Sequence, residues 1–125
     1  MPNLRLEGKV AIVSGAGTYG GSGVGNGAAA AIVFAREGAR VLLVDAVLEW
    51  ADVTRATIEE EGGVAISTVA DVTSPDDCKR AIELAVATFG GLDILHNNVG
   101  GGGRGSVVEA TEEAWERSIS LNLMS

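Results

Sequence analysis

The chain has 125 residues, of which 46% are hydrophobic, and carries a formal charge of −8 at pH 7. This length and composition suit a single globular domain with its own buried core. The negative charge argues against a nucleic acid or an anionic membrane surface as a partner, because both are bound largely through Lys and Arg.

The first half of the chain alternates between short apolar runs and helical patterns. Residues 10–13 predict a strand that is buried on both faces, and a glycine-rich stretch follows it as far as Gly27. An alanine-rich helix is expected over 27–37, with Gly38 in the place of a helix C-terminal glycine. Residues 41–44 predict a second buried strand, which ends at Asp45.

The second half repeats this alternation. A more polar helix is expected over 49–61, a third strand over 64–70 and a fourth strand over 92–96. Between the last two strands, Ser74 and the proline and acids after it predict a helix start. The apolar stripe predicted for this helix consists of Cys78, Ile82, Ala85, Val86 and Phe89. A last helix, capped by Thr111, completes the pattern.

Alternating strands and helices with short connections predict an α/β fold, a parallel sheet with right-handed crossovers. About four strands with flanking helices are available, whereas a complete doubly wound sheet has six or more. We therefore expect a partial doubly wound, Rossmann-type sheet in which the edge beside strand 92–96 lacks a neighbour.

No apolar run approaches the ~20 residues that span a bilayer, and the first residues have no signal-peptide character. Cys78 is the single cysteine, which excludes an intrachain disulfide and favours a reducing compartment. These features predict a cytoplasmic protein that does not enter membranes.

The glycine-rich stretch has the features of a dinucleotide-binding loop. Gly15 to Gly20 match G-x-G-x-x-G, between a strand and a helix. Glycines let a backbone approach a pyrophosphate, and a helix N-terminus offers free N–H groups. Uninterrupted helix formers begin only at Ala28, so we place the helix start at Asn26 and Gly27. The phosphate-facing glycines are then Gly25 and Gly27, and Gly15 closes the first strand; the alternative is a mobile glycine turn.

Asp45 lies 18 residues beyond Gly27, at the end of the second strand. A carboxylate there can accept hydrogen bonds from adenosine ribose hydroxyls and repel a 2′-phosphate. Neither Ala16 nor Ala46 supplies an arginine that would neutralise such a phosphate. The sequence therefore favours NAD over NADP, the alternative being an ordinary solvated acid at a strand end.

Five segments, in order, resemble the short-chain dehydrogenases/reductases. Residues 6–15 follow the family's opening, L-x-G-K-V-A-hydrophobic-V-T-G, and the final G-x-G of its loop falls on Gly25-Asn26-Gly27 after about six extra residues. Asp71-Val72 is similar to the family's D-V pair, residues 92–100 to L-D-x-L-V-N-N-A-G and residues 120–123 to x-x-N-L.

The resemblance implies a nicotinamide enzyme that moves a hydride between NAD and a small-molecule alcohol or carbonyl substrate, without a metal site, and that forms a homo-oligomer. It also implies residue roles. Asp71 and Val72 would hold the adenine, and Asn122 would belong to an Asn-Ser-Tyr-Lys catalytic tetrad whose Tyr is the general acid/base. The implied cofactor-binding residues are Gly15, Gly25, Asn26, Gly27, Asp45, Asp71, Val72, Asn98, Val99 and Gly100.

The tetrad's other members have no match in this chain. Its single tyrosine is Tyr19, and the residue four places on is Gly23 rather than lysine. Residues 1–125 are therefore interpreted as the N-terminal dinucleotide-binding part of a family member, truncated before the catalytic Tyr and Lys and inactive alone. The alternatives are a non-catalytic dinucleotide-binding module and an S-adenosylmethionine-binding methyltransferase.

Three further side chains are given structural interpretations. His96, within a strand, is expected to be a hydrogen-bonded structural histidine, and Cys78 to be inert. In the last helix, Trp115, Ile119 and Asn122 fall on one face. An asparagine on such a stripe needs hydrogen-bond partners, while Trp115 and Ile119 should be exposed in the chain alone.

Overall fold

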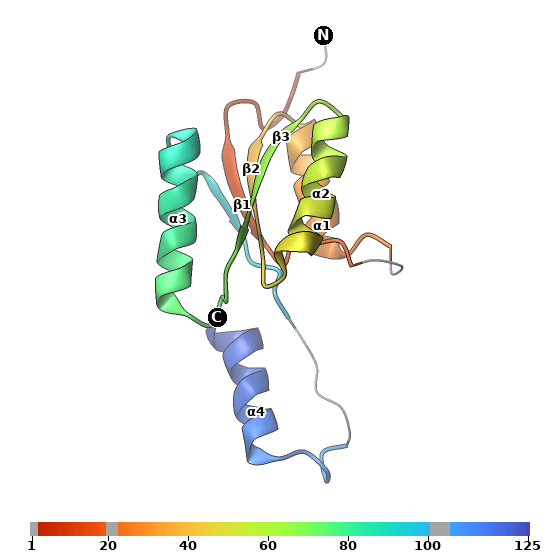
Figure 1. Cartoon of the computed structure of the whole chain (residues 1–125), viewed down its shortest axis with the longest axis vertical. Coiled ribbons are helices and arrows are strands. Elements are labelled where there is room, and N and C mark those ends of the chain that lie inside the picture. The colour runs from red at the N-terminus through yellow and green to blue at the C-terminus, as the bar shows by residue number, and fades with distance from the viewer. Residues whose placement is uncertain (1–2, 20–22, 101–105) are drawn as a thin grey trace.

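The computed structural model describes residues 3–19, 23–100 and 106–125. These residues form a parallel sheet with helices on both of its faces (Figure 1). The strands are β1 (Val10–Ser14), β2 (Arg40–Asp45), β3 (Val64–Val69) and β4 (Ile94–His96). The helices are α1 (Asn26–Arg36), α2 (Leu48–Glu60), α3 (Pro75–Phe89) and α4 (Glu112–Ile119), followed by a π-helical turn, η1 (Ser120–Met124).

The strand order is β3-β2-β1-β4, and every pair is parallel. The predicted fold class is thus confirmed, including the place of β4 at one edge of the described sheet. In register, Val13 lies between Leu43 of β2 and His96 of β4. The chain order reverses between β1 and β4, and ligands of open α/β sheets bind at such a switch point, beyond the carboxyl ends of the strands.

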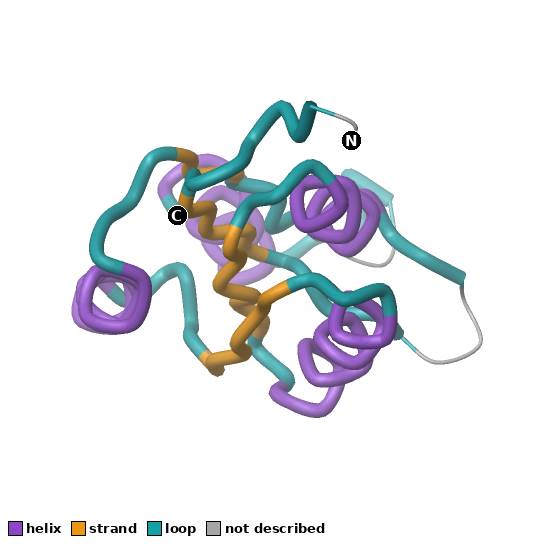
Figure 2. The backbone as a smooth tube through the Cα atoms, turned by 90° about the horizontal axis from the view of Figure 1, so that it is seen from above, coloured by secondary structure: helices purple, strands orange, loops and turns teal. Residues whose placement is uncertain are grey.

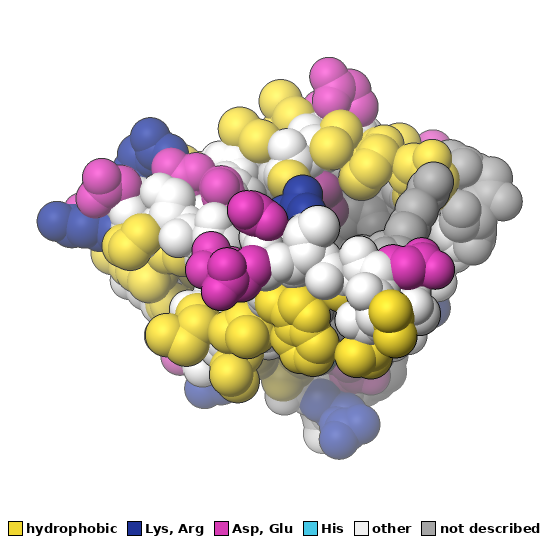
Figure 3. Space-filling view, turned by 90° about the horizontal axis from the view of Figure 1, so that it is seen from below, with side chains coloured by type: hydrophobic (Ala, Val, Ile, Leu, Met, Phe, Trp, Pro, Cys, Tyr) yellow, Lys and Arg dark blue, Asp and Glu magenta, His cyan; other side chains and the backbone are white. Residues whose placement is uncertain are grey.

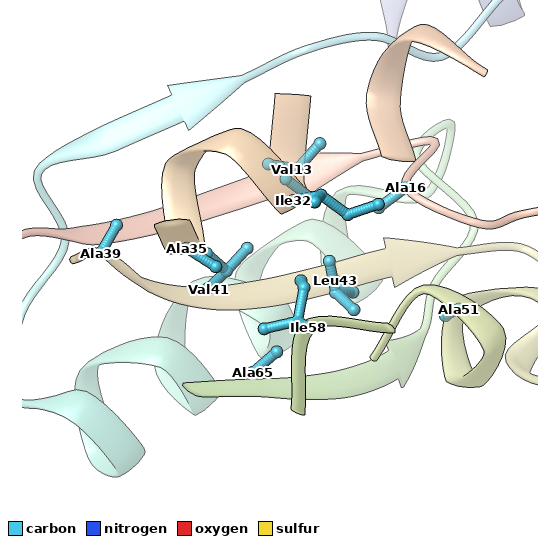
Figure 4. Close-up of a cluster of buried hydrophobic side chains, with 11 residues drawn as sticks. Val13, Ala16, Ile32, Ala35, Ala39, Val41, Leu43, Ala51, Ile58 and Ala65 are labelled. Carbon is cyan, nitrogen blue, oxygen red and sulfur yellow. The ribbon is translucent and has the colours of Figure 1, made fainter. Parts of the chain in front are cut away.

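Two apolar layers hold the helices to the sheet. Helices α1 and α2 cover one face and α3 covers the other (Figures 1 and 2). Figure 4 shows the first layer, where the small side chain of Ala35 lets α1 lie close to Val41 and Leu43. Val10 to Val13 are all buried, as a strand covered on both faces requires.

Helix α3 begins as predicted but faces the sheet with a different stripe. The Ser74 hydroxyl accepts a hydrogen bond from the Asp77 N–H, which confirms the cap. The buried side chains are Ala81, Ala85 and Phe89, whereas Ile82 and Val86 are exposed. The predicted stripe is therefore wrong in part, because the helix turns Ala81 and Ala85, together with Phe89, toward the sheet and leaves Ile82 and Val86 outside.

Strand β4 is shorter than predicted, because Leu92 and Asp93 precede it in an irregular segment. Asp93 still attaches that segment to β1: its carboxylate accepts a hydrogen bond from the Val10 N–H at 2.9 Å, and its own N–H donates to the Val10 carbonyl at 2.9 Å. The start of β4 is thus joined to the start of β1 by both side chain and backbone.

Helix α4 lies beyond the carboxyl ends of the strands (Figure 1). The Thr111 hydroxyl caps it by accepting from the Ala114 N–H. None of its residues is buried, and Trp115 and Ile119 are 52% and 48% exposed, as expected for the chain alone. No helix among the described residues is long and apolar enough to cross a membrane.

Candidate functional site

A cavity of about 290 Å³ opens at the carboxyl end of the sheet, on the side of the molecule that Figure 3 views. Seven predicted cofactor-binding residues line it together: Gly15, Asp45, Asp71, Val72, Asn98, Val99 and Gly100. Residues that the sequence did not single out complete the wall, namely Val44, Ala46, Trp50, Ala70 and Leu121. The cavity thus spans the ends of β1, β2, β3 and β4.

The Ser14 hydroxyl joins the ends of β1 and β4 at the switch point. Its Oγ donates to the His96 carbonyl at 3.4 Å and accepts from the Asn98 N–H at 3.2 Å. The Asn98 side-chain amide donates to the Gly15 carbonyl at 3.4 Å. These bonds fix Asn98 beside the cavity, and Gly15 turns the chain away from β1 with a φ of 65°.

Helix α1 approaches this junction closely because residue 27 has no side chain. A Cβ built on Gly27 would lie 2.2 Å from the Gly15 carbonyl oxygen and 2.6 Å from Asn98 Nδ2. Gly25 is the N-cap of α1, with no side-chain cap bond, and Asn26 is the first helical residue. Both lie at the helix start, as predicted, but neither lines the cavity. Gly20 of the predicted motif lies outside the described residues.

The Asp45 carboxylate is held by the backbone on two sides. Oδ2 accepts from the Gly17 N–H at 2.9 Å, and Oδ1 accepts from the Val47 N–H at 3.0 Å. The glycine at 17 permits this contact, because a Cβ there would be 2.6 Å from Oδ2. A carboxylate can accept about four hydrogen bonds, so both oxygens keep capacity toward the cavity.

Asp71 is oriented by Thr73. The Thr73 hydroxyl and N–H both donate to Asp71 Oδ1, at 2.6 and 2.9 Å. Both hydrogen bonds stabilise the charged carboxylate, the hydroxyl bond more than the backbone bond. They therefore lower the pKa of Asp71 below its ordinary value. Two fixed carboxylates, Asp45 and Asp71, therefore border the cavity.

The described part of the extended glycine loop is attached to α2. The Thr54 hydroxyl, which is buried, donates to the Ala16 carbonyl at 2.7 Å. Since that bond uses its one proton, the Thr18 hydroxyl must donate in the 2.8 Å contact between the two threonines. The Thr18 N–H also donates to the Trp50 carbonyl at 2.9 Å. We call this set of contacts the loop–α2 anchor.

The remaining predicted residues take these places. Asn122 lies in η1 and not on a buried stripe; its Nδ2 donates to the Ser118 carbonyl at 2.9 Å, and its Oδ1 would lie 3.0 Å from a Cβ at Gly100. The Cys78 thiol is half-buried and donates to the Val72 carbonyl. The His96 ring packs at right angles to that of Phe34, 5.8 Å away.

Comparison with known proteins assigns this architecture. The family model described as short chain dehydrogenase matches residues 9–125. The chain belongs to the short-chain dehydrogenase family. This match excludes the methyltransferase alternative. It confirms the family that the sequence motifs predict.

Relatives in this family include dehydrogenases of named substrates. The chain is 38% identical over 120 residues to cyclohexanol dehydrogenase of Acinetobacter sp. (strain SE19), covering 95% of this chain and 45% of that protein. It is 40% identical over 123 residues to 7alpha-hydroxysteroid dehydrogenase of Escherichia coli (strain K12), covering 98% and 46%. The chain thus spans less than half the length of these relatives.

Solved structures show the same fold. The hydroxysteroid dehydrogenase from Escherichia coli superposes with a TM-score of 0.86 at 35% identity, covering 98% of this chain and 49% of that chain. A short chain dehydrogenase from Mycobacterium smegmatis gives a TM-score of 0.86 at 34% identity, with coverages of 98% and 48%. The four-stranded sheet with its flanking helices therefore matches about half of each of these short-chain dehydrogenase structures.

Proposed function

We propose that the complete protein is an NAD-dependent oxidoreductase that transfers a hydride between nicotinamide and a small alcohol or carbonyl compound. The observation that carries this proposal is the cavity at the switch point, bordered by Asp45 on one side and by Asn98, Val99 and Gly100 on the other. Dehydrogenases among the relatives, named for cyclohexanol and for a hydroxysteroid, support the class of substrate.

The residues present suit a dinucleotide. The start of α1 offers N–H groups that no side chain caps, and its positive dipole end favours a pyrophosphate. A side chain at Gly15, Gly17 or Gly27 would crowd the neighbouring atoms, so these glycines allow the backbone to lie close around the cavity. When bound, the dinucleotide would supply or accept the hydride, while Asp45 would accept hydrogen bonds from ribose hydroxyls.

The preference for NAD over NADP rests on charge. Asp45 carries a fixed negative charge at the cavity, and none of the described residues that line it is Lys or Arg. A 2′-phosphate placed near this carboxylate would be repelled without a compensating cation. We propose the same carboxylate as the main source of selectivity.

Cofactor titration of the complete protein tests this assignment. We expect NADH to bind more tightly than NADPH, and Asp45→Asn, which removes the charge but keeps an acceptor, to reduce that ratio about tenfold, the equivalent of about 1.4 kcal/mol. Asp93→Asn, a matched change at the other end of the sheet, should leave the ratio unchanged. Wild-type protein that used both cofactors equally well would contradict the assignment of Asp45.

Asn122 remains the one proposed catalytic residue in this chain. We propose that it positions a water or a neighbouring side chain in the complete enzyme, where further residues would supply the acid/base tyrosine and its lysine. Tyr19 does not suit that role: it lies in the glycine loop with its ring against Trp50 at 4.8 Å. The 125-residue chain alone is therefore proposed to bind dinucleotide without catalysis.

A further inference from the structure

Trp50 occupies a place in α2 that the packing of the helix does not require. The side chains that α2 buries are Ala51, Thr54 and Ile58, which form its face toward the sheet. Trp50 lies off that face and is 36% exposed, yet it lines the cavity beside Asp45 and Asp71. A large aromatic side chain is thus presented to the cavity.

The indole is held in position by the glycine loop. The Tyr19 ring meets it at 87°, with the ring centroids 4.8 Å apart. Gly17 lies so close that an added Cβ would be 2.6 Å from Trp50 Cβ. Together with the Thr18 hydrogen bond to the Trp50 carbonyl, these contacts fix the residue before any ligand arrives. A fixed aromatic wall loses little conformational entropy when a ligand packs against it.

The chemistry around this wall matches one part of a dinucleotide. Asp45 can accept from ribose hydroxyls, and the oriented Asp71 can accept from an exocyclic amine. A flat apolar ring beside two carboxylates suits a purine base, whose π-face stacks on aromatic side chains. Among the described residues that line the cavity, Trp50 is the only aromatic one.

We propose that Trp50 is a cofactor-positioning residue that packs against the adenosine half of the dinucleotide, with the glycine loop as its support. The inference rests on the proposed function, and it adds a determinant of affinity that acts on the adenosine half alone. Removing the indole should weaken the binding of every ligand that carries adenosine and leave the binding of ligands without adenosine unchanged.

The test uses the complete protein and three probes: NADH, ADP-ribose and reduced nicotinamide mononucleotide. Dissociation constants are measured for wild type and for Trp50→Ala, Trp50→Leu and Trp50→Phe, with folding checked by thermal unfolding. Trp50→Leu keeps apolar bulk beneath Tyr19, so it carries the test if the alanine variant does not fold. Trp115→Ala, a change at the exposed tryptophan of α4, is the matched control.

We expect Trp50→Ala and Trp50→Leu to raise the dissociation constants of NADH and ADP-ribose about tenfold. Reduced nicotinamide mononucleotide should bind as to wild type, Trp50→Phe should recover most of the affinity, and Trp115→Ala should change none of the three values. Unchanged NADH affinity in the folded leucine variant, or an equal loss for the mononucleotide, would overturn the inference while leaving the proposed function intact. A wild-type protein that binds neither NADH nor ADP-ribose would instead overturn the proposed function.

Discussion

At the scale of single residues, the glycines of the first loop have different tasks that the sequence pattern does not separate. Gly15 needs its positive φ, and Gly17 admits the Asp45 carboxylate. Gly27 is buried against the Gly15 carbonyl, whereas Gly25 has open space around it and a φ of −72° that any residue adopts. One pattern therefore covers glycines that the packing requires and a glycine that it does not.

The pair Gly27→Ala and Gly25→Ala tests this distinction. We expect Gly27→Ala to lower the free energy of unfolding by about 2 kcal/mol or more, because the new methyl group would overlap backbone atoms that cannot turn aside. Gly25→Ala should stay within about 1 kcal/mol of wild type. Urea unfolding of both variants gives the comparison; similar losses would show that the helix start, and not its packing on Gly15, is the sensitive point.

At the scale of residues, the sequence predicted several side chains that the structure brings to one cavity. Asp45, Asp71 and Asn98 line this cavity because each ends or follows a strand, and parallel strands bring such ends to one edge. The contacts of Trp50 and Thr54 were not predicted, because they depend on a loop folding back onto α2, which neither periodicity nor motif spacing encodes. A tryptophan one place off the apolar face of a helix was the one available signal.

At the scale of elements, the loop–α2 anchor joins the glycine loop to the helix that follows Asp45. Its centre is the buried Thr54 hydroxyl, which bonds to the Ala16 carbonyl and to Thr18. Helix α2 thus holds the glycine loop, which precedes α1 in the chain. Through this hydroxyl, the positions of Ala16 and Thr18 are tied to α2.

Replacement of Thr54 tests the anchor. Thr54→Val keeps the shape but removes the donor, leaving the Ala16 carbonyl unpaired, so we expect a loss of about 1–3 kcal/mol in the free energy of unfolding. NADH affinity should fall as well, since the loop would no longer hold Trp50 in place. Thr54→Ser retains the hydroxyl and should keep most of both; a serine variant as impaired as the valine one would point to methyl packing instead of hydrogen bonding.

Element boundaries followed the sequence wherever a local cause sets them. Ser74 with Pro75, and Thr111, start helices as expected, and Gly38 ends α1 with a φ of 96°. The stripe of α3 was misjudged because Ala81 is a weaker hydrophobic signal than Ile82, although a small residue fits closer to the sheet. Which face of a helix is buried was decided by packing and not by the summed hydrophobicity of the face.

At the scale of the whole molecule, one side of the sheet and its last helix carry apolar surface outward. Leu95 of β4 is 53% exposed and lines a pocket together with the exposed Ile82 of α3, and Val86 of the same helix is also exposed. The outer edge of β4 has no neighbouring strand among the described residues, so its backbone N–H and C=O groups face outward. Contiguous apolar surface of this kind promotes association.

We therefore expect the isolated 125-residue chain to associate in solution and to show no dehydrogenase activity. The activity prediction is chemical, since the chain has one tyrosine and it is engaged in the glycine loop. Size-exclusion chromatography, together with assays on NAD and a panel of secondary alcohols, checks both parts. A monodisperse monomer with measurable turnover would be incompatible with them and would require a catalytic group other than those proposed here.

The pairing of β1 with β4 also determines when the cavity can form during synthesis. The bonds that make this pair, at Asp93 and at Ser14, join residues 83 and 82 positions apart in the chain. Strands β1, β2 and β3 can assemble in the order in which they leave the ribosome, whereas contacts between distant residues form slowly because a long loop must close first. A nascent chain can thus acquire most of its core while it still has only one side of the crevice. The proposed nucleotide site would then be completed at the last step of folding of this region, and nucleotide binding would report that step.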